Sequence, residues 1–308
     1  MQQRSYGPTG RSVSVIGLGG AYLTHQSFAD GVATVRTALD LGVTYFDTSP
    51  MYGRGASQAV VGEALDGVEA PHVLATKLGY FARPEAFRHP EALRTQFEEN
   101  LRLLRRDRVD TLQLHEADQH AWWSDDRDHK GRIDDQRAYD FAAAPALAVL
   151  GQLKAEGRIG FAGISGNHAE AMRRVVEAVD VDTFLLAFNY DLLRRQGRRV
   201  LPVARSRGAA CLVGAIFQRG LTHVDRSLLD ERPRWMTPDL AERYRALFEL
   251  QAQAGMSLAT MGVRYMVAQA EPDVIIIGAR NPDEIRECVG AAEAGPLPAD
   301  LVEAIERI

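Results

Sequence analysis

The feature that most constrains the fold is an alternation, along the whole chain, of short apolar runs with longer amphipathic stretches. The short runs are nearly continuous in Val, Ile and Leu, which is typical of parallel strands buried on both faces. The longer stretches supply the helical crossovers that parallel strands require. The alternation predicts strands at Val13–Ile16, Val43–Phe46, Val73–Thr76, Val109–Leu114, Ile159–Ile164, Phe184–Ala187, Ala209–Val213 and Val274–Ile277.

Helices are expected between and after these strands. Eight strand–helix units without a break in composition predict a closed (β/α)8 TIM barrel, and therefore a single domain over residues 1–308. An open doubly wound sheet is the alternative. The turn residues Gly7-Pro8-Thr9-Gly10 predict an N-terminal β-hairpin that plugs the bottom of the barrel. The expected helices are Phe28–Leu41, Ser57–Leu65, Pro90–Leu104, Pro145–Glu156, Ala169–Val179, Leu192–Arg207, stretches between Asp239 and Ala270, Asp283–Val289 and Asp300–Ile308.

The charge balance argues against a nucleic-acid partner, because 36 basic and 41 acidic residues give a net charge of −5. The two cysteines, Cys211 and Cys288, lie far apart and form no disulfide framework, which indicates a reducing compartment. The N-terminus has no apolar signal segment, and no apolar run is long enough to span a bilayer. We therefore expect a cytoplasmic protein without a membrane partner. The sequence carries no signal for an oligomeric state.

A long insertion, from Glu116 to Ala144, follows the fourth predicted strand. It would lie at the catalytic end of a barrel, and loops of this length are usually functional or disordered. It contains Trp122 and Trp123, and tryptophan is seldom exposed without a binding role. We interpret the insertion as a substrate lid, with a plain surface insertion as the alternative.

Four polar residues stand at or just after the ends of three consecutive predicted strands. Asp47 and Tyr52 follow the second strand, Lys77 ends the third, and His115 ends the fourth. Each alone has an ordinary explanation as a helix cap, a solvated charge or a packed side chain. Together they indicate a catalytic site, because the loops at this end of a barrel build the active site.

The residue types suit the reduction of a carbonyl, which needs a hydride from one side and a proton from the other. Tyrosine has a pKa of about 10 and exchanges its proton slowly at pH 7. An ammonium at Lys77 would lower the pKa of Tyr52, and Asp47 would keep Lys77 charged. His115 would donate a hydrogen bond to the substrate oxygen.

These segments resemble the aldo-keto reductase superfamily. The shared motifs are Phe46-Asp47-Thr48-Ser49 with Tyr52-Gly53, then Ala75-Thr76-Lys77, then Leu114-His115. The resemblance implies a (β/α)8 barrel, the catalytic tetrad Asp47, Tyr52, Lys77 and His115 with tyrosine as acid/base, and a nicotinamide cofactor. Leu185 stands where many relatives carry glutamine, which is similar to the sugar-dehydrogenase branch that includes L-galactose and D-threo-aldose dehydrogenases.

The resemblance also implies a cofactor site. Arg280 is expected to meet the 2′-phosphate of NADP, because guanidinium matches the geometry of phosphate. Glu284 and Glu287 are expected to hold the adenine. NADP(H) is therefore favoured, with NAD(H) as the alternative. The full expected set is Ser165, Asn167, Asn189, Gly214, Ala215, Phe217, Gly220, Gly278, Arg280, Glu284 and Glu287.

Two weaker motifs are set aside. Gly17-Leu18-Gly19-Gly20 lacks the third glycine of a dinucleotide fingerprint and is interpreted as a tight βα turn. His115, Asp118 and His120 have no second set of ligands, so no metal is expected.

We expect an NADP(H)- or NAD(H)-dependent oxidoreductase that interconverts a small carbonyl (an aldehyde, ketone or aldose) and an alcohol. Tyr22, Trp122 and Trp123 would line the substrate pocket. A redox-neutral isomerase or dehydratase would use the same site. A cofactor-sensing regulatory protein resembling potassium-channel β subunits is a further alternative.

Overall fold

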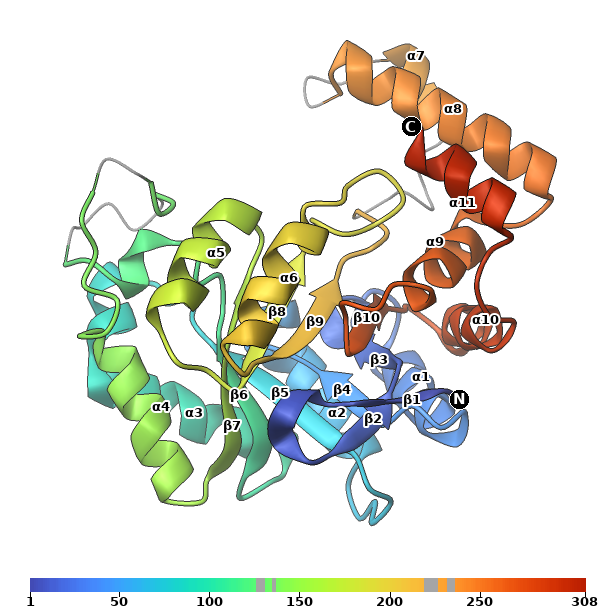
Figure 1. Ribbon diagram of the computed structural model, residues 1–308. Coiled ribbons are helices and arrows are strands. Elements are labelled where there is room, and N and C mark those ends of the chain that lie inside the picture. The colour runs from blue at the N-terminus through green and yellow to red at the C-terminus, as the bar shows by residue number, and fades with distance from the viewer. Residues whose placement is uncertain (126–130, 135–136, 219–226, 232–235) are drawn as a thin grey trace.

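The computed structural model describes residues 1–125, 131–134, 137–218, 227–231 and 236–308. It confirms the closed barrel, whose parallel strands pair in the order β10-β3-β4-β5-β6-β7-β8-β9 (Figure 1). Hydrogen bonds between β10 and β3 close the sheet, so the open alternative is excluded. The strands are β3 Ile16–Gly19, β4 Tyr45–Asp47, β5 Val73–Leu78, β6 Val109–Leu114, β7 Ile159–Gly166, β8 Thr183–Ala187, β9 Ala210–Gly214 and β10 Val274–Gly278.

Helices cover the outside of the barrel, where their apolar faces pack on the strands. The covering helices are α1 Phe28–Asp40, α2 Ala56–Ala64, α3 Pro90–Leu104, α4 Pro145–Ala155, α5 Ala169–Ala178, α6 Gly197–Ser206, α9 Leu258–Val267 and α10 Pro282–Glu293. Three further helices, α7 Ser227–Glu231, α8 Pro238–Ala254 and α11 Ala299–Glu306, lie beyond this layer at one end (Figure 1).

The N-terminal hairpin is confirmed, with β1 Gln3–Ser5 antiparallel to β2 Ser12–Ser14. Tyr6, in the turn between them, is completely buried and packs against the rings of Tyr45 and Phe161. The Tyr6 hydroxyl lies 3.1 Å from the hydroxyl oxygen of Thr111 on β6. The turn therefore closes the barrel at the end opposite the catalytic end.

The first barrel strand begins later than the sequence predicted. The expected strand Val13–Ile16 is divided, because residues 12–14 belong to the hairpin and the barrel strand starts at Ile16. Gly17 and Gly19, expected in a turn, lie within β3. A Cβ on Gly17 would lie 2.9 Å from side-chain carbons of Tyr45 and Val274, so the packed barrel interior leaves no space for a side chain there.

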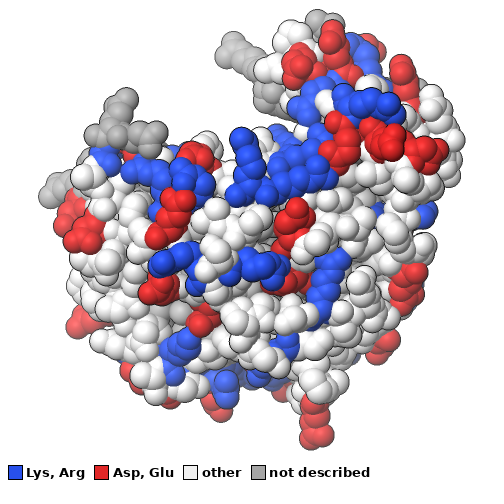
Figure 2. All heavy atoms as spheres, viewed as in Figure 1, with Lys and Arg blue, Asp and Glu red and all other residues white. Residues whose placement is uncertain are grey.

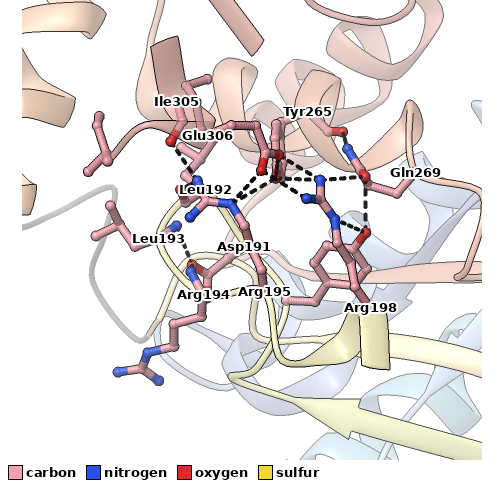
Figure 3. Close-up of polar contacts among 12 residues, drawn as sticks. Asp191, Leu192, Leu193, Arg194, Arg195, Arg198, Tyr265, Gln269, Ile305 and Glu306 are labelled. Atoms are coloured by element: carbon pink, nitrogen blue, oxygen red, sulfur yellow. Dashed lines mark hydrogen bonds and ion pairs between the residues drawn. The ribbon is translucent and has the colours of Figure 1, made fainter. Parts of the chain in front are cut away.

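The C-terminal helix α11 is held by Arg195 and Arg198, which lie at or just before the start of α6 (Figure 3). Glu306 accepts hydrogen bonds from Arg198 at 2.6 and 2.8 Å, and also from Tyr265 of α9. Arg195 lies 3.2 Å from Glu306 and donates to the Ile305 carbonyl oxygen. On the face seen in Figure 2, basic side chains gather near the upper edge and acidic ones lie among them. The charges of Arg195 and Arg198 are balanced in part by their ion pairs with Glu306.

Asp191 lies beside this cluster, in the loop after β8, and is almost completely buried (Figure 3). Its Oδ1 accepts hydrogen bonds from the amides of Leu193 and Arg194 and from the side chain of Gln218. Burial outweighs these bonds and raises the pKa of Asp191 to about 6. Since the folded protein binds this proton more tightly than the unfolded chain, the Asp191 contribution to stability falls as pH rises towards 6.

The variant Asp191→Asn is therefore expected to gain stability over the wild type as pH rises. Asparagine keeps the accepting oxygen but removes the buried charge, so its advantage should be about 1–3 kcal/mol larger at pH 8 than at pH 4. Denaturant unfolding at both pH values measures the difference. Equal differences at the two values would contradict a raised pKa for Asp191.

Candidate active site

A cavity of about 980 Å³ opens at the C-terminal ends of the barrel strands. Its floor is made by residues at or next to these ends, because side chains of alternate strand residues point into the barrel. Phe248 and Gln251 of α8, with Ser257 before α9, form part of the outer wall. The floor residues are Gly19, Asp47, Lys77, His115, Ser165, Ala187, Gly214 and Gly278.

All four residues of the predicted tetrad line this cavity. The Lys77 ammonium forms an ion pair with Asp47 Oδ1 and donates to the Thr48 carbonyl oxygen at 3.0 Å. Both partners are at least 97% buried. The Lys77 Nζ lies 5.1 Å from the ring centroid of Tyr52, and the His115 ring centroid lies 5.6 Å from the same point. The tyrosine is therefore flanked by a cation and an imidazole.

Local geometry explains how Tyr52 reaches this position. It follows β4 by a short turn and begins a 3-10 segment, Tyr52–Gly55. Gly53 and Gly55 have φ values of 57° and 89°, which glycine adopts without strain. The chain can therefore reverse within a few residues and return the phenol over the barrel.

Charges and burial set the protonation of these groups. Burial raises the pKa of Asp47 and lowers that of Lys77, and the attraction within the pair opposes both shifts. Burial, then the negative charges of Asp47 and Glu116, raises the pKa of Tyr52 well above its usual value. This direction is opposite to the lower pKa expected from Lys77, because burial and the two negative charges set the shift. Tyr52 therefore keeps its proton at neutral pH.

His115 is neutral, because burial and the charge of Lys77 lower its pKa well below the usual value. Its Nδ1 lies 2.9 Å from the hydroxyl oxygen of Ser49, which already accepts a hydrogen bond from the Met51 amide. The Ser49 hydroxyl can donate its hydrogen to Nδ1, and in that tautomer the imidazole proton lies on Nε2.

Backbone strain is concentrated around the same cavity. Five non-glycine residues on its wall have left-handed backbone conformations, with φ between 48° and 62°. Such conformations cost about 1–2 kcal/mol each for L-residues and cluster at functional sites. They are Tyr80, Glu116, Phe188, Ala215 and Gln218.

A model of the Aldo/keto reductase family matches residues 15–308 of this sequence. The chain belongs to the aldo/keto reductase family. It is an oxidoreductase, as the sequence predicted. It is 27% identical to L-galactose dehydrogenase of Arabidopsis thaliana over 305 residues, covering 94% of this chain and 88% of that protein. It is 24% identical to D-threo-aldose 1-dehydrogenase of a Pseudomonas species, covering 87% and 84%.

The fold matches solved structures of the family. An aldo-keto reductase from Bacillus halodurans, solved in its holo form, superposes with a TM-score of 0.76 at 23% identity. The match covers 100% of this chain and 96% of that one. The barrel architecture is therefore shared with this structure.

The cavity of this aldo/keto reductase fits a nicotinamide dinucleotide, the cofactor of the family. Its volume is at the upper end of the usual range for cofactor pockets, about 300–1,000 Å³. Apolar Leu185 and polar Ser165 and Asn167 line the end that holds the tetrad. At Gly278 an added Cβ would lie 2.6 Å from the Tyr22 ring, so glycine allows this ring to pack directly on the main chain.

Most of the expected cofactor residues lie on the cavity wall. The exception is Asn189, whose amide donates to the Asn167 carbonyl oxygen at 2.8 Å and so supports a wall residue from behind. Gly220 lies outside the described residues. Those on the wall are Ser165, Asn167, Gly214, Ala215, Phe217, Gly278, Arg280, Glu284 and Glu287.

Of the expected substrate residues, Tyr22 lies on the wall, but Trp122 and Trp123 do not. Both indoles are at least 97% buried, and their Nε1 atoms donate to main-chain carbonyl oxygens. Trp122 packs edge-on against Phe81 and Phe87. The two tryptophans therefore belong to the buried core, which corrects the expected tryptophan lid.

Trp122→Leu is expected to destabilise the fold without changing nucleotide binding. Removing a buried indole from an aromatic cluster should cost about 2–4 kcal/mol of unfolding free energy. Denaturant unfolding and a nucleotide titration measure the two effects. Phe28→Leu is the control, because Phe28 is half exposed and the change should cost less than about 0.5 kcal/mol. A large loss of turnover in a Trp122→Leu protein that is folded and binds nucleotide normally would restore the lid interpretation.

The sequence missed several wall residues. Glu116 accepts a hydrogen bond from the Asn167 side chain at 2.8 Å and another from Gln119. Tyr80 lies 4.8 Å, centroid to centroid, from the His115 ring. Both residues come shortly after the end of a strand, and this position in the sequence could have indicated that they line the cavity. Phe248 and Gln251 carried no signal, because only the packing of α8 brings them to the wall.

Within the described ranges, no cluster of three or more His, Cys, Asp or Glu side chains could hold a metal ion. No helix in the part of the chain that the structure describes is long and apolar enough to cross a membrane.

Proposed function

We propose that Tyr52 is the acid/base of a reversible interconversion between a carbonyl and an alcohol. The observation that supports this proposal is the Tyr52 phenol on the cavity wall, flanked by the Lys77–Asp47 pair and the His115 imidazole. A bound nicotinamide supplies the hydride in reduction and accepts it in oxidation. The chain itself binds and orients the substrate and exchanges the proton with it.

In reduction, the Tyr52 hydroxyl donates its proton to the carbonyl oxygen as negative charge develops there. The raised pKa of Tyr52 suits this direction, because the acid form prevails at neutral pH. The Lys77 ammonium, 5.1 Å from the ring centroid, stabilises the phenolate that remains. His115 holds the same oxygen through its Nε2 proton, which fixes the carbonyl before the transfer.

In oxidation the phenolate must first form, so the rate of alcohol oxidation should rise with pH. Asp47 keeps Lys77 protonated in a site where burial favours the neutral amine. The charged pair therefore maintains the electrostatic environment in both directions of the reaction.

A sugar or another small polyhydroxylated carbonyl compound is the substrate class we favour. The similarity to L-galactose and D-threo-aldose dehydrogenases supports this choice. So does the polar wall around the tetrad, where Glu116 and Asn167 can exchange hydrogen bonds with hydroxyl groups. We further propose a single-domain cytoplasmic enzyme, consistent with the buried free thiols of Cys211 and Cys288.

The proposal is tested by following nicotinamide absorbance with NADH and NADPH against aldehydes, ketones and aldoses. Consumption of either cofactor with one of these classes supports it. Tight nucleotide binding without consumption would favour a cofactor sensor. Conversion of a substrate without net consumption would favour a redox-neutral isomerase or dehydratase.

A further inference from the structure

At the end of the cavity formed by α10, Arg280 is not available in the way that the sequence suggested. Arg280, just after β10, is paired with Glu284 of α10. The Glu284 carboxylate accepts hydrogen bonds from the Arg280 amide at 2.8 Å and from Arg280 Nε at 2.7 Å, as well as from Nη2. The carboxylate thus occupies the position that an external anion would need in order to bind this arginine.

The first amides of α10 are occupied as well. The Asn281 side chain accepts hydrogen bonds from the amides of Asp283 and Glu284, at 3.1 and 3.0 Å. A helix N-terminus with free amides favours a phosphate. Here the chain's own oxygen atoms take these donors.

A second carboxylate lies one turn further along α10. Glu287 accepts hydrogen bonds from the hydroxyls of Ser257 and Thr260 at the start of α9. Glu284, Glu287 and Arg280 all line the cavity. Counted over these three described residues, two carboxylates face one guanidinium, which gives a negative charge at this end.

We propose that this end of the cavity selects NAD(H) over NADP(H), with Glu284 as the specificity-determining residue. The proposal rests on the nicotinamide-dependent function proposed above. A ribose 2′-hydroxyl is a neutral donor and forms a charge-assisted hydrogen bond with a carboxylate. A 2′-phosphate would be repelled and would have to displace Glu284 from Arg280. The preference for NADP(H) expected from the sequence took Arg280 without a partner. Its pairing with Glu284 reverses that preference.

The test is to measure dissociation constants of NADH and NADPH by calorimetric titration of the full-length protein without substrate. The wild type should bind NADH about tenfold or more tightly than NADPH, a difference of about 1.4 kcal/mol. Glu284→Gln keeps the size but removes the charge and releases Arg280. It should shift the ratio of the two dissociation constants about tenfold or more towards NADPH.

Two further variants make the result specific. Asp283→Asn removes a neighbouring, highly exposed carboxylate that pairs with Arg286, and it should leave the ratio unchanged. The double variant Arg280→Met with Glu284→Gln should lose the gain in NADPH affinity. The reason is that the guanidinium released from Glu284 is the group that would bind the 2′-phosphate.

Tighter binding of NADPH by the wild type, or an unchanged ratio in Glu284→Gln, would overturn the inference and leave the oxidoreductase proposal standing. If neither nucleotide bound, both the NAD(H) inference and the oxidoreductase proposal would be overturned.

Discussion

Replacing Tyr52 with phenylalanine is expected to lower the turnover number by about 10²- to 10⁴-fold, the usual contribution of a positioned general acid. The hydroxyl is the group placed to deliver the proton, whereas the ring would still fill its position beside Lys77 and His115. Nucleotide affinity should change little, because the adenosine end of the cavity is untouched. Steady-state rates and a nucleotide titration on the same preparation separate the two effects.

Tyr139→Phe is the matched control. It also removes a phenolic hydroxyl, but Tyr139 stacks on Phe141 in the insertion, away from the cavity wall. Its turnover should equal that of the wild type. If Tyr52→Phe kept wild-type turnover, Tyr52 would have no role as acid/base.

Replacing Lys77 with methionine is expected to cost about 3–5 kcal/mol of unfolding free energy, because it leaves the Asp47 carboxylate buried without its counter-ion. Turnover should fall as well, since no cation remains to stabilise the Tyr52 phenolate. The loss of stability should shrink as pH falls, because protonation removes the unpaired charge of Asp47. Denaturant unfolding at two pH values measures this dependence.

The double variant Asp47→Asn with Lys77→Met separates stability from catalysis. It contains no unpaired charge and should recover most of the lost unfolding free energy. Its turnover should remain low, because the ammonium is still absent. A double variant as unstable as Lys77→Met alone would show that packing of the lysine side chain, rather than its charge, stabilises the site.

The strands and the tetrad could be predicted from the sequence for the same physical reason. Buried parallel strands are mostly apolar, so polar residues at or next to their carboxyl ends, such as Asp47, Lys77 and His115, indicate the end of the barrel that carries the site. In a barrel these ends converge on one face, whatever lies between them in the sequence. The structure brings all of these residues to one cavity.

Contacts between side chains explain the errors. Whether Trp122 faces the substrate or the core depends on Phe81 and Phe87, which come from the preceding loop. The pairing of Arg280 with Glu284 was accessible, since residues four apart on a helical turn are neighbours. Each residue also suits a ligand, a phosphate for Arg280 and an adenine for Glu284, and spacing alone does not distinguish these contacts from the pair.

The left-handed residues around the cavity have a consequence for attempts to engineer this enzyme. Glycine at Tyr80, Glu116 or Phe188 would relieve about 1 kcal/mol or more of conformational strain at each position. A selection for heat resistance alone should therefore accumulate glycine there and gradually remove the side chains that shape the pocket. Thermostability and substrate recognition would compete at the same few positions, so a useful selection must impose both at once.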